Sequence, residues 1–423
     1  MIIIHYMKQP TYRPRALAPA VERALETHPV VVLSGARQTG KTTLVRNLPS
    51  AATRSLQSLD DFDVLELARD RPEDLLARGR RLTLDEVQRV PELLLAIKRD
   101  VDARRQRGRF LLTGSANLLL MRQVADSLAG RAVYLLLAPF TAGERQGEGR
   151  LPPWSEVASC RRGAEVAQRI NELPAADCDW QREILRGGMP PASLARSARE
   201  RAQWFDGYVQ TYLERDLRDL SQIASLPDFR RLMGLAVHRL GQLLNQSELG
   251  RDAGISQATA HRYLGLLETT FQVHKVTPYS VNPSKRLIKA PKLYWADPGL
   301  AAHLAGVSSV NALRSSPLLG AFAENAVLSG LLTWREATHP RSEIHYWRTA
   351  GGAEVDFVVE RGPRLIPLEI KTARRIRISD IRHLEIFLDD YGKQAPWGAV
   401  LYDTDRAHVI TRRVIGLPLS RFL

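Results

Sequence analysis

The sequence predicts an α/β protein whose first third forms a parallel β-sheet with helices on both faces. Apolar strand-like runs alternate with helical segments over this region, which is typical of strand–helix–strand units. A loop with the pattern GxxxxGK[ST] stands between one of these runs and a helix. Helical periodicity then dominates to about residue 268, and short strand-like runs return beyond it.

Five strands are predicted for the first sheet: the apolar runs 30–33, 110–113 and 132–137, and the segments 55–59 and 81–84. A helix is predicted over 91–105, between the third run and the fourth. Residues 143–180 contain several glycines, prolines and charged residues with weak periodicity, which indicates an extension or a linker. Ser197 precedes a helical pattern over 198–220 and is a suitable N-cap.

The last hundred residues are predicted to combine a helix around Glu324 with three strands. These strands are 343–348, 355–359 and 365–370. We find no internal repeat and no low-complexity segment.

The composition limits the class of protein. A chain of 423 residues, 44% apolar and 25% charged, is expected to form about two to four soluble globular domains. The 60 Lys and Arg exceed the 46 Asp and Glu by 14, a charge that attracts polyanions such as nucleic acid or anionic membranes. No apolar run approaches the ~18 residues of a membrane span, and the N-terminus lacks the basic region and cleavage site of a secretion signal. We therefore expect a cytoplasmic protein with no membrane contact.

Cysteine and lysine are both rare. The two cysteines, Cys160 and Cys178, are too few for a CxxC…CxxC zinc site or a disulfide framework. Only nine of the 60 basic residues are lysine. Because codon bias favours arginine to this extent, an arginine carries little functional information here, whereas a lysine within a motif carries more.

The GxxxxGK[ST] loop predicts a phosphate-binding P-loop, or Walker A motif. Its two glycines let the backbone wrap an anion, Lys41 reaches the β/γ-phosphates of ATP, and the Thr42 hydroxyl holds Mg²⁺. A chance match in a glycine-containing turn is the alternative. The predicted nucleotide-binding residues of the loop are Gly35, Ala36, Arg37, Gln38, Thr39, Gly40, Lys41, Thr42 and Thr43.

Two further strand ends supply polar groups to the same predicted site. Asp85 and Glu86 end the third strand, where Asp85 binds Mg²⁺ through water and Glu86 orients or deprotonates the attacking water. The alternative is a pair of solvated acids. The fourth strand ends in Thr113-Gly114-Ser115-Ala116-Asn117. One of the polar side chains of this segment is expected to sense the γ-phosphate, and Ser115 is our candidate. The alternative is a simple turn.

A resemblance to a known family extends this interpretation. The first part of the chain contains the segments GARQTGKTTLVR, LTLDEVQRVPELLLAIK, FLLTGSANLLLM, DSLAGR and LAPFTAGE. They are followed by GGMPPA, YVQTYLERDLRDL, GQLLNQSELGRDAGIS, APKLYWADPGLAAHL and AEVDFVVE. With these segments in this order, the chain resembles prokaryotic AAA+-type ATPases with a formerly uncharacterised C-terminal region. The resemblance covers most of the chain. It implies an AAA+-type P-loop ATPase domain at 1–190, connecting helices at 191–227, a winged helix-turn-helix at 228–306 and a restriction-endonuclease-like domain of the PD-(D/E)xK type at 307–423.

Such ATPase cores place the active site between subunits, so the resemblance also implies a homo-oligomer, with a hexamer as one candidate. Arg131, in the segment SLAGR, is then a candidate arginine finger that acts on the site of a neighbouring subunit. The alternative is a solvated arginine.

The segment 244–268 predicts a helix-turn-helix. Ser247 caps a short helix, Gly254 suits the turn, and Ser256 caps a second helix. The predicted DNA contacts are Gln257, Thr259, His261 and Arg262 on the second helix and Lys285, Arg286, Lys289 and Lys292 on a basic hairpin, which also contains Lys275. Protein contact, or a lid on the ATPase, is the alternative.

The C-terminal strands carry polar residues at i and i+2, which share one strand face. Asp356 followed by Glu369-x-Lys371 matches the D…ExK signature of nucleases, in which Asp356 and Glu369 hold Mg²⁺ and Lys371 activates a water. Glu324 is a candidate additional acid, and the layout is similar to that of archaeal Holliday-junction resolvases. A solvated strand face, or an inactive domain that only binds DNA or partners, is the alternative.

Together these features predict a Mg²⁺-dependent ATP hydrolase that binds DNA by structure rather than by sequence, branched or duplex, and couples ATP turnover to DNA remodelling. ATP and Mg²⁺ are the expected cofactors. Two alternatives remain at this point: an ATP-gated, metal-dependent nuclease, and a nucleotide-controlled signalling or defence switch that acts through protein partners.

Overall fold

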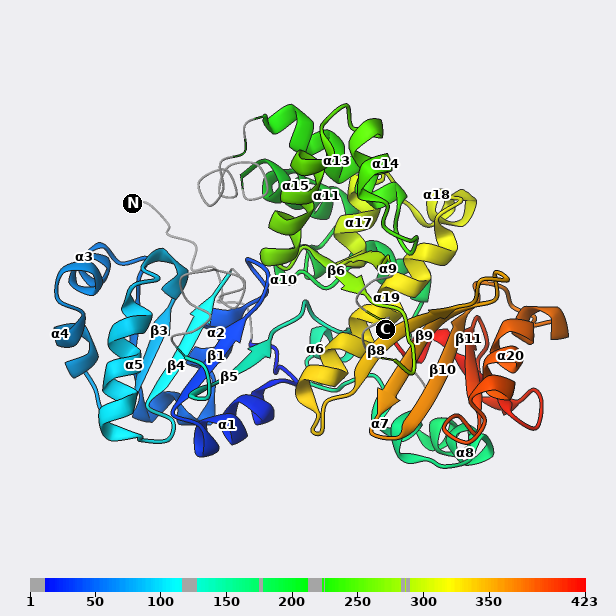
Figure 1. Cartoon of the computed structure of the whole chain (residues 1–423), viewed down its shortest axis with the longest axis horizontal. Helices are drawn as coiled ribbons and strands as arrows, with labels where there is room; N and C mark the ends of the chain where they lie inside the picture. Colours follow the sequence, from blue (N-terminus) through cyan, green and yellow to red (C-terminus); the bar gives the residue numbers. More distant parts are fainter. Residues whose placement is uncertain are drawn as a thin grey trace, which may run out of the picture.

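The computed structural model describes residues 12–115, 128–174, 178–211, 223, 225–282, 286 and 290–423. Two α/β units lie at opposite ends of the molecule, with a group of helices between them (Figure 1). The N-terminal sheet is coloured blue to cyan, and the C-terminal sheet is orange to red. Among the described helices, none is both long enough and apolar enough to cross a membrane.

The N-terminal unit contains the parallel sheet that the alternation of strands and helices predicts. Its five strands run in the order β2-β3-β4-β1-β5. They are β1 (Val30–Ser34), β2 (Ser55–Ser58), β3 (Leu82–Asp85), β4 (Phe110–Gly114) and β5 (Ala132–Leu136), and all neighbours are parallel. The five predicted strands are therefore confirmed. Since β4 lies between β1 and β3, the carboxyl ends of these three strands meet at one edge of the sheet.

Helices cover both faces of this sheet, which explains why its inner strands β1 and β4 are almost entirely apolar, whereas the edge strand β2 is polar and half-buried. Val31 and Leu33 pack against α1 (Ala18–Thr27) and α2 (Lys41–Arg46). Val30 and Val32 face the other side, where they join one core with the helices α3 (Phe62–Asp70), α4 (Pro72–Ala77) and α5 (Leu93–Arg104). Each such buried side chain contributes about 1.5–3 kcal/mol.

The connection beyond β5 is helical. Its elements are α6 (Ala142–Arg145), α7 (Trp154–Ser159), α8 (Gly163–Glu172), α9 (Trp180–Arg186), α10 (Pro190–Ser193) and α11 (Ala198–Tyr208). The predicted cap of α11 is present, because the Ser197 hydroxyl accepts a hydrogen bond from the Glu200 amide at 3.1 Å. The part of the predicted 198–220 helix beyond residue 211 lies outside the described residues.

Helices α7 and α8 pack on the C-terminal sheet and not on the ATPase sheet. The apolar face of α8, with Val166 and Ile170, shares a core with Ile415 and Leu417 of that sheet. The sequence-based division at residue 190 assigns both helices to the N-terminal unit. The weak periodicity of this segment gave no indication of its packing partner.

The central unit continues with three helices and a strand pair. These are α13 (Leu226–His238), α14 (Gln246–Asp252), α15 (Gln257–Thr269), β6 (Val273–Val276) and β7 (Lys292–Trp295), and the two strands are antiparallel. Ser256 caps α15 as predicted, accepting from the Thr259 amide at 3.1 Å. The predicted Ser247 cap is wrong: Asn245 caps α14, and its side chain accepts from the Glu248 amide at 3.1 Å.

The C-terminal unit is a mixed sheet with the order β12-β13-β11-β10-β9-β8. The predicted strands correspond to β8 (Glu343–Arg348), β9 (Glu354–Arg361) and β10 (Arg364–Ile370), whereas β11 (Gly398–Tyr402), β12 (His408–Val409) and β13 (Val414–Pro418) were not predicted. The helices after β7 are α17 (Pro298–Leu304), α18 (Val310–Ser315), α19 (Leu319–Ala337) and α20 (Arg382–Asp390). Short 3₁₀ turns lie at Pro49–Thr53 and Val87–Arg89 in the N-terminal unit and at Ile378–Ile381 and Leu419–Arg421 in the C-terminal unit.

One hydrophobic core runs through the central and C-terminal units. It contains side chains of α13, α15, α17 and α19 together with Phe357 and Leu368 of the C-terminal sheet. Ala36, from the loop after β1, belongs to this core rather than to the core of its own sheet. The phosphate-loop segment is therefore in direct contact with the rest of the chain.

Candidate functional site

The loop between β1 and α2 folds around the side chain of its lysine. Gly35 has φ 157°, and a side-chain carbon at this position would lie 2.5 Å from the carbonyl oxygen of Leu137, so glycine is required. Lys41, the first residue of α2, is 4% exposed, and its Nζ donates to the carbonyl oxygens of Gly35 and Ala36, each at 3.0 Å. Backbone amides arranged in this way form a concave site for a phosphate group.

The other predicted loop residues divide into an inner and an outer set. Thr39 is fully buried, and its hydroxyl donates to the Ala36 carbonyl at 2.8 Å. The side chains of Arg37, Gln38 and Thr43 are exposed. The outer residues can therefore offer their backbone amides to a nucleotide while their side chains face away from the buried part of the loop.

The carboxyl ends of β1, β3 and β4 bring three predicted residues together. The Thr42 hydroxyl donates to Asp85 Oδ2 at 2.7 Å, and the Thr113 hydroxyl donates to Asp85 Oδ1. Asp85 itself is 3% exposed. A buried carboxylate and the Thr42 hydroxyl thus lie within hydrogen-bonding distance, although 43 residues separate them in the chain.

Glu86 occupies a strained position beside this pair. Its φ of 59° and ψ of 43° lie in the left-handed region, which is rare for a residue other than glycine and is found preferentially at functional sites. Its amide donates to the Thr113 hydroxyl at 3.3 Å. Gln88 donates to the Glu86 carboxylate and, at 2.9 Å, to the Ser115 hydroxyl. Gln88 was missed in the sequence, where its only signal was a polar side chain two residues after Glu86.

The electrostatics place these groups in one site. Burial lowers the pKa of the Lys41 ammonium to about 8, while the carboxylates of Glu86 and Asp85 act in the opposite direction. Both acids are therefore close enough to the lysine to influence its charge. Of the three candidate sensor residues, Thr113 and Ser115 contact the acids, and Asn117 lies outside the described residues.

Arg131 lies at the opposite edge of the sheet. It directly precedes β5, whose Ala132 pairs with Val30 at the amino end of β1, whereas the phosphate loop follows the carboxyl end of β1. Its guanidinium binds the Asp102 carboxylate with N–O distances of 2.5 and 2.9 Å. Arg131 is therefore not part of the nucleotide site of its own chain.

Arg15 is a contact of the phosphate loop that the sequence did not indicate. It is buried, and it donates to the Thr39 carbonyl at 2.7 Å and to the Ala138 carbonyl at 2.5 Å. It also pairs with the fully buried Glu144 at 3.1 Å. Because its neighbours in sequence carry no motif, nothing local distinguishes Arg15 from the many other arginines.

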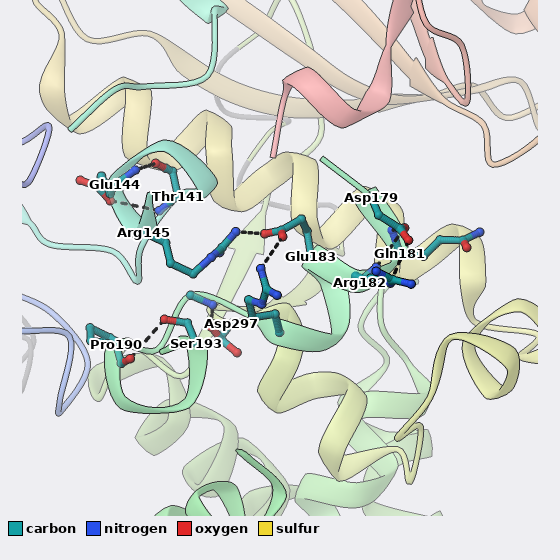
Figure 2. A network of polar contacts seen from close by, with 12 residues as sticks. Thr141, Glu144, Arg145, Asp179, Gln181, Arg182, Glu183, Pro190, Ser193 and Asp297 are labelled. Atoms are coloured by element: carbon teal, nitrogen blue, oxygen red, sulfur yellow. Dashed lines mark hydrogen bonds and ion pairs between the residues drawn. The ribbon is translucent and has the colours of Figure 1, made fainter. Parts of the chain in front are cut away.

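A polar network continues from Glu144 towards the central helices (Figure 2). Glu144 and Thr141 cap α6 reciprocally, and Arg145 of the same helix forms an ion pair with Glu183 of α9. Glu183 also binds Arg186 at 3.0 Å. The loop around Lys41 is thus linked to α9 through two successive buried ion pairs.

Asp297 holds the turn between α9 and α10. It is fully buried, and its carboxylate accepts from the amides of Gly188, Met189 and Leu300 at 2.6, 2.9 and 2.7 Å. We expect Asp297→Ala to lower the free energy of unfolding by about 2–4 kcal/mol, because it leaves buried amides without an acceptor. Urea denaturation measures this loss, with Asp70→Ala, at an exposed acid that ends α3, as the control. Equal stability of the two variants would contradict the prediction.

The predicted DNA-contact side chains on α15 lie on its outer face. Gln257, His261 and Arg262 are exposed and Thr259 is half-buried, while Ala260 on the opposite face is buried. His261 Nδ1 lies 2.9 Å from Gln246 Oε1. This face is accessible to a partner.

The basic hairpin differs from its prediction. Lys285 and Lys289 lie outside the described residues. Arg286 pairs with Glu360 at 2.7 Å, and Lys275 pairs with Glu268 at 2.5 Å. Lys292 is 2% exposed, so the prediction that it grips DNA from the surface is wrong: the first residue of β7 points into the C-terminal unit, where carboxylates neutralise it.

The predicted C-terminal residues also meet. Lys371 Nζ lies 2.7 Å from Glu369 Oε1, and Asp356 Oδ2 accepts from the Ile370 amide at 2.8 Å. Burial, reinforced by repulsion from Asp356, raises the pKa of Glu369 well above its usual range and that of Glu324 to about 8. We call Glu324, Glu354, Asp356 and Glu369 the acidic cluster.

Three segments of the chain match known family models. Residues 27–146 match an AAA domain, residues 178–311 match a domain of unknown function (DUF8612), and residues 319–422 match a second domain of unknown function (DUF4143). The AAA match covers the parallel sheet, the phosphate loop and the acids after β3. The N-terminal unit is therefore an AAA-type, ATP-binding P-loop ATPase domain.

Solved structures with partial likeness include three ATPases. The Walker-type ATPase PABY2304 of Pyrococcus abyssi is 18% identical with a TM-score of 0.39, and the match covers 69% of this chain and 98% of that one. A variant of RuvB from Thermotoga maritima is 18% identical with a TM-score of 0.28, and the match covers 64% of this chain and 93% of that one. AMPPCP-bound DnaA of Aquifex aeolicus is 16% identical with a TM-score of 0.25, and the match covers 59% of this chain and 86% of that one. These scores are too low to carry a functional inference.

Two curated proteins match nearly the whole chain. They are uncharacterized protein Rv2008c of Mycobacterium tuberculosis and uncharacterized protein Mb2031c of Mycobacterium bovis, each 33% identical over 410 residues. The match covers 97% of this chain and 84% of each relative, so it includes the central and C-terminal units as well as the ATPase domain. The chain therefore belongs to the family of these two mycobacterial proteins, and it carries an AAA-type ATPase domain at its N-terminal end.

Proposed function

We propose that this ATPase hydrolyses ATP with Mg²⁺ at the carboxyl edge of its parallel sheet, and that Lys41, Thr42, Asp85 and Glu86 carry the reaction. The observation that supports it best is the 2.7 Å hydrogen bond between the Thr42 hydroxyl and Asp85, beside the buried Lys41. Lys41 stabilises the β- and γ-phosphates. On binding, its ammonium exchanges the carbonyl oxygens of Gly35 and Ala36 for phosphate oxygens.

The residues at this edge fit a magnesium ion. Mg²⁺ prefers hard oxygen ligands and usually keeps several of its waters, so the Thr42 hydroxyl and the Asp85 carboxylate suffice as protein ligands. When bound with ATP, the ion neutralises charge on the β- and γ-phosphates. Thr113 holds the second oxygen of Asp85 and thereby orients the carboxylate.

Glu86 is the proposed base. Its carboxylate accepts hydrogen bonds from Gln88 and from the Ser115 hydroxyl. In this proposal, Ser115 and Gln88 reposition the Glu86 carboxylate when a γ-phosphate is bound. The left-handed backbone at Glu86 turns the chain directly after β3, so Glu86 lies at the carboxyl end of that strand. A water between Glu86 and the γ-phosphate would be activated there.

We further propose that ATP turnover is coupled to DNA binding by a winged helix formed by α13–α15 and β6–β7. The exposed outer face of α15 and the net charge of +14 support it. The coupling route is short, since Ala36 packs in the central core and the Tyr208 hydroxyl of α11 donates to the Arg37 carbonyl at 3.4 Å. DNA contact of this kind is led by phosphates and not by bases.

This proposal predicts that DNA stimulates ATP hydrolysis, more with a four-way junction than with linear duplex, and that the stimulation fades as salt is raised, because phosphate contacts release counterions. Steady-state hydrolysis with and without each DNA measures it. Arg262→Ala on α15 should reduce the stimulation and leave the basal rate unchanged, whereas Arg199→Ala on α11 should change neither the stimulation nor the basal rate. A rate that is indifferent to DNA at low salt would rule out the coupling.

Oligomerisation belongs to the same proposal. An arginine finger must reach the nucleotide of a neighbouring subunit, and Arg131 lies remote from the site of its own chain, on the side where Asp102 now holds it. The proposed assembly is a ring in which Arg131 exchanges Asp102 for the phosphates of the neighbour.

A second candidate function is a nucleotide-controlled switch that acts through a protein partner. The observation that favours it is the neutralisation of Lys275, Arg286 and Lys292 by carboxylates of the same chain, which removes these charges from a DNA-binding surface. Turnover that is slow and indifferent to DNA distinguishes this function from the first.

A further inference from the structure

Lys292 reaches from the central unit into the acidic cluster of the C-terminal unit. Its Nζ lies 2.5 Å from Glu354 Oε1, 3.9 Å from Glu324 Oε2 and 4.0 Å from Asp356 Oδ1. The side chain is 3% exposed and lies near the ring of Tyr346, at 5.7 Å from its centroid. One ammonium group is therefore surrounded by three carboxylates on two separate elements, α19 and β9.

The remaining contacts leave little room for a divalent cation. Lys371 holds Glu369 Oε1, the Ile370 amide holds Asp356 Oδ2, and the Tyr294 hydroxyl donates to Glu324 Oε2 at 2.8 Å. Across the described parts of the chain, no group of three or more His, Cys, Asp or Glu side chains is arranged to hold a metal ion. A D…ExK metal site requires free carboxylate oxygens at roughly 2.0–2.6 Å from the ion. The Lys292 ammonium lies 4.0 Å from Asp356 Oδ1, the oxygen that the Ile370 amide does not hold, so a metal ion bound there would meet its positive charge.

The cluster nevertheless keeps the chemistry of a cation site. Glu369 is 5% exposed, and its Oε2 has no hydrogen-bond partner, although most buried carboxylate oxygens do. The Lys292 ammonium lies within 4.0 Å of oxygens of Glu324, Glu354 and Asp356, and its side chain is 3% exposed, so solvent screens this attraction only weakly. Positive charge is therefore strongly favoured at this point.

We propose that Lys292 is a built-in counter-ion that occupies the cation position of the acidic cluster, so that binding of a divalent metal there and seating of the Lys292 side chain exclude each other. In this conformation the C-terminal unit holds no metal, and it cannot cleave a phosphodiester by metal-dependent chemistry. The same ion pairs tie β7 of the central unit to β9 and α19. The proposal is independent of ATP hydrolysis.

The test is Mn²⁺ binding to the full-length, nucleotide-free protein, measured by electron paramagnetic resonance of the free ion. Asp356→Asn alone should leave Mn²⁺ binding as it is in wild type, because the acidic cluster of wild type binds no Mn²⁺. Lys292→Met, which keeps the length of the stem and removes the charge, should create one site that binds Mn²⁺ at least about tenfold more tightly than any wild-type site, because the repelling charge is gone. The double variant Lys292→Met/Asp356→Asn should lose that site.

Lys275→Met is the matched control, because Lys275 lies on the paired strand β6 and its ion pair is with Glu268, outside the acidic cluster. It should bind Mn²⁺ like wild type. One Mn²⁺ in wild type that Asp356→Asn abolishes would overturn the proposal, even if Lys292→Met does not fold. Where Lys292→Met folds, unchanged Mn²⁺ binding would overturn it too.

Discussion

Lys41→Ala is expected to abolish nucleotide binding, and ATP hydrolysis with it. The loss in affinity for ATP should be about 100-fold or more, since a charged hydrogen bond to a phosphate contributes up to about 3 kcal/mol and Lys41 makes several. Isothermal titration with a non-hydrolysable ATP analogue measures the affinity, and phosphate release measures turnover.

The neighbouring threonines provide the control for this variant. Thr42 bonds Asp85, whereas the side chain of Thr43 is exposed. Thr42→Ala should therefore impair Mg²⁺-dependent turnover and Thr43→Ala should not. Thermal unfolding shows whether each variant keeps its fold. Turnover at the wild-type rate by a folded Lys41→Ala would remove the assignment of the site.

Glu86→Gln is expected to bind ATP normally and to hydrolyse it about 100- to 10,000-fold more slowly, the range over which a general base acts. The amide keeps the size of the side chain but cannot accept a proton. Single-turnover hydrolysis measures the chemical step apart from product release. Retained affinity with lost turnover distinguishes this variant from Lys41→Ala.

Glu92→Gln is the matched control, because Glu92 is an exposed acid six residues further along the same segment. It should hydrolyse ATP at the wild-type rate. If Glu86→Gln retained more than about a tenth of the wild-type rate, the base would have to be another group, and Asp85 is the other acid close to Lys41.

The ATPase unit was largely predictable because its signals are local. A strand, a loop and a helix that are consecutive in the chain form the phosphate loop, so a pattern of eight residues from Gly35 to Thr42 suffices to indicate it. The strands were recognisable because a parallel sheet covered on both faces requires unbroken apolar runs, as in Val30–Ser34. The strands β11 and β13 were not predicted, although they are as long and as buried as β1, and β12 has only two residues.

Other parts of the two sites depend on partners that lie far apart in the chain. Arg15 contacts the phosphate loop and Glu144, 129 residues away, without any motif around it. Lys292 looked like a DNA contact because four of the nine lysines lie between residues 271 and 292. The local sequence does not distinguish an exposed lysine from a buried one whose carboxylate partners lie at residues 324 to 356. Whether a lysine is exposed or buried in an ion pair depends on residues that are its neighbours only in the folded chain.

Composition, periodicity and the phosphate loop thus sufficed to indicate a P-loop ATPase with a helical middle and a second α/β end, and the resemblance to a known family added the AAA type. Three features became visible only in the folded chain: α7 and α8 belong to the C-terminal core, the phosphate loop is linked to α9 through Arg15 and Arg145, and Lys292 fills the acidic cluster. The physical reason is the same for all three. Packing and ion pairing join surfaces according to shape and charge in space, and these contacts leave no periodic trace along the sequence.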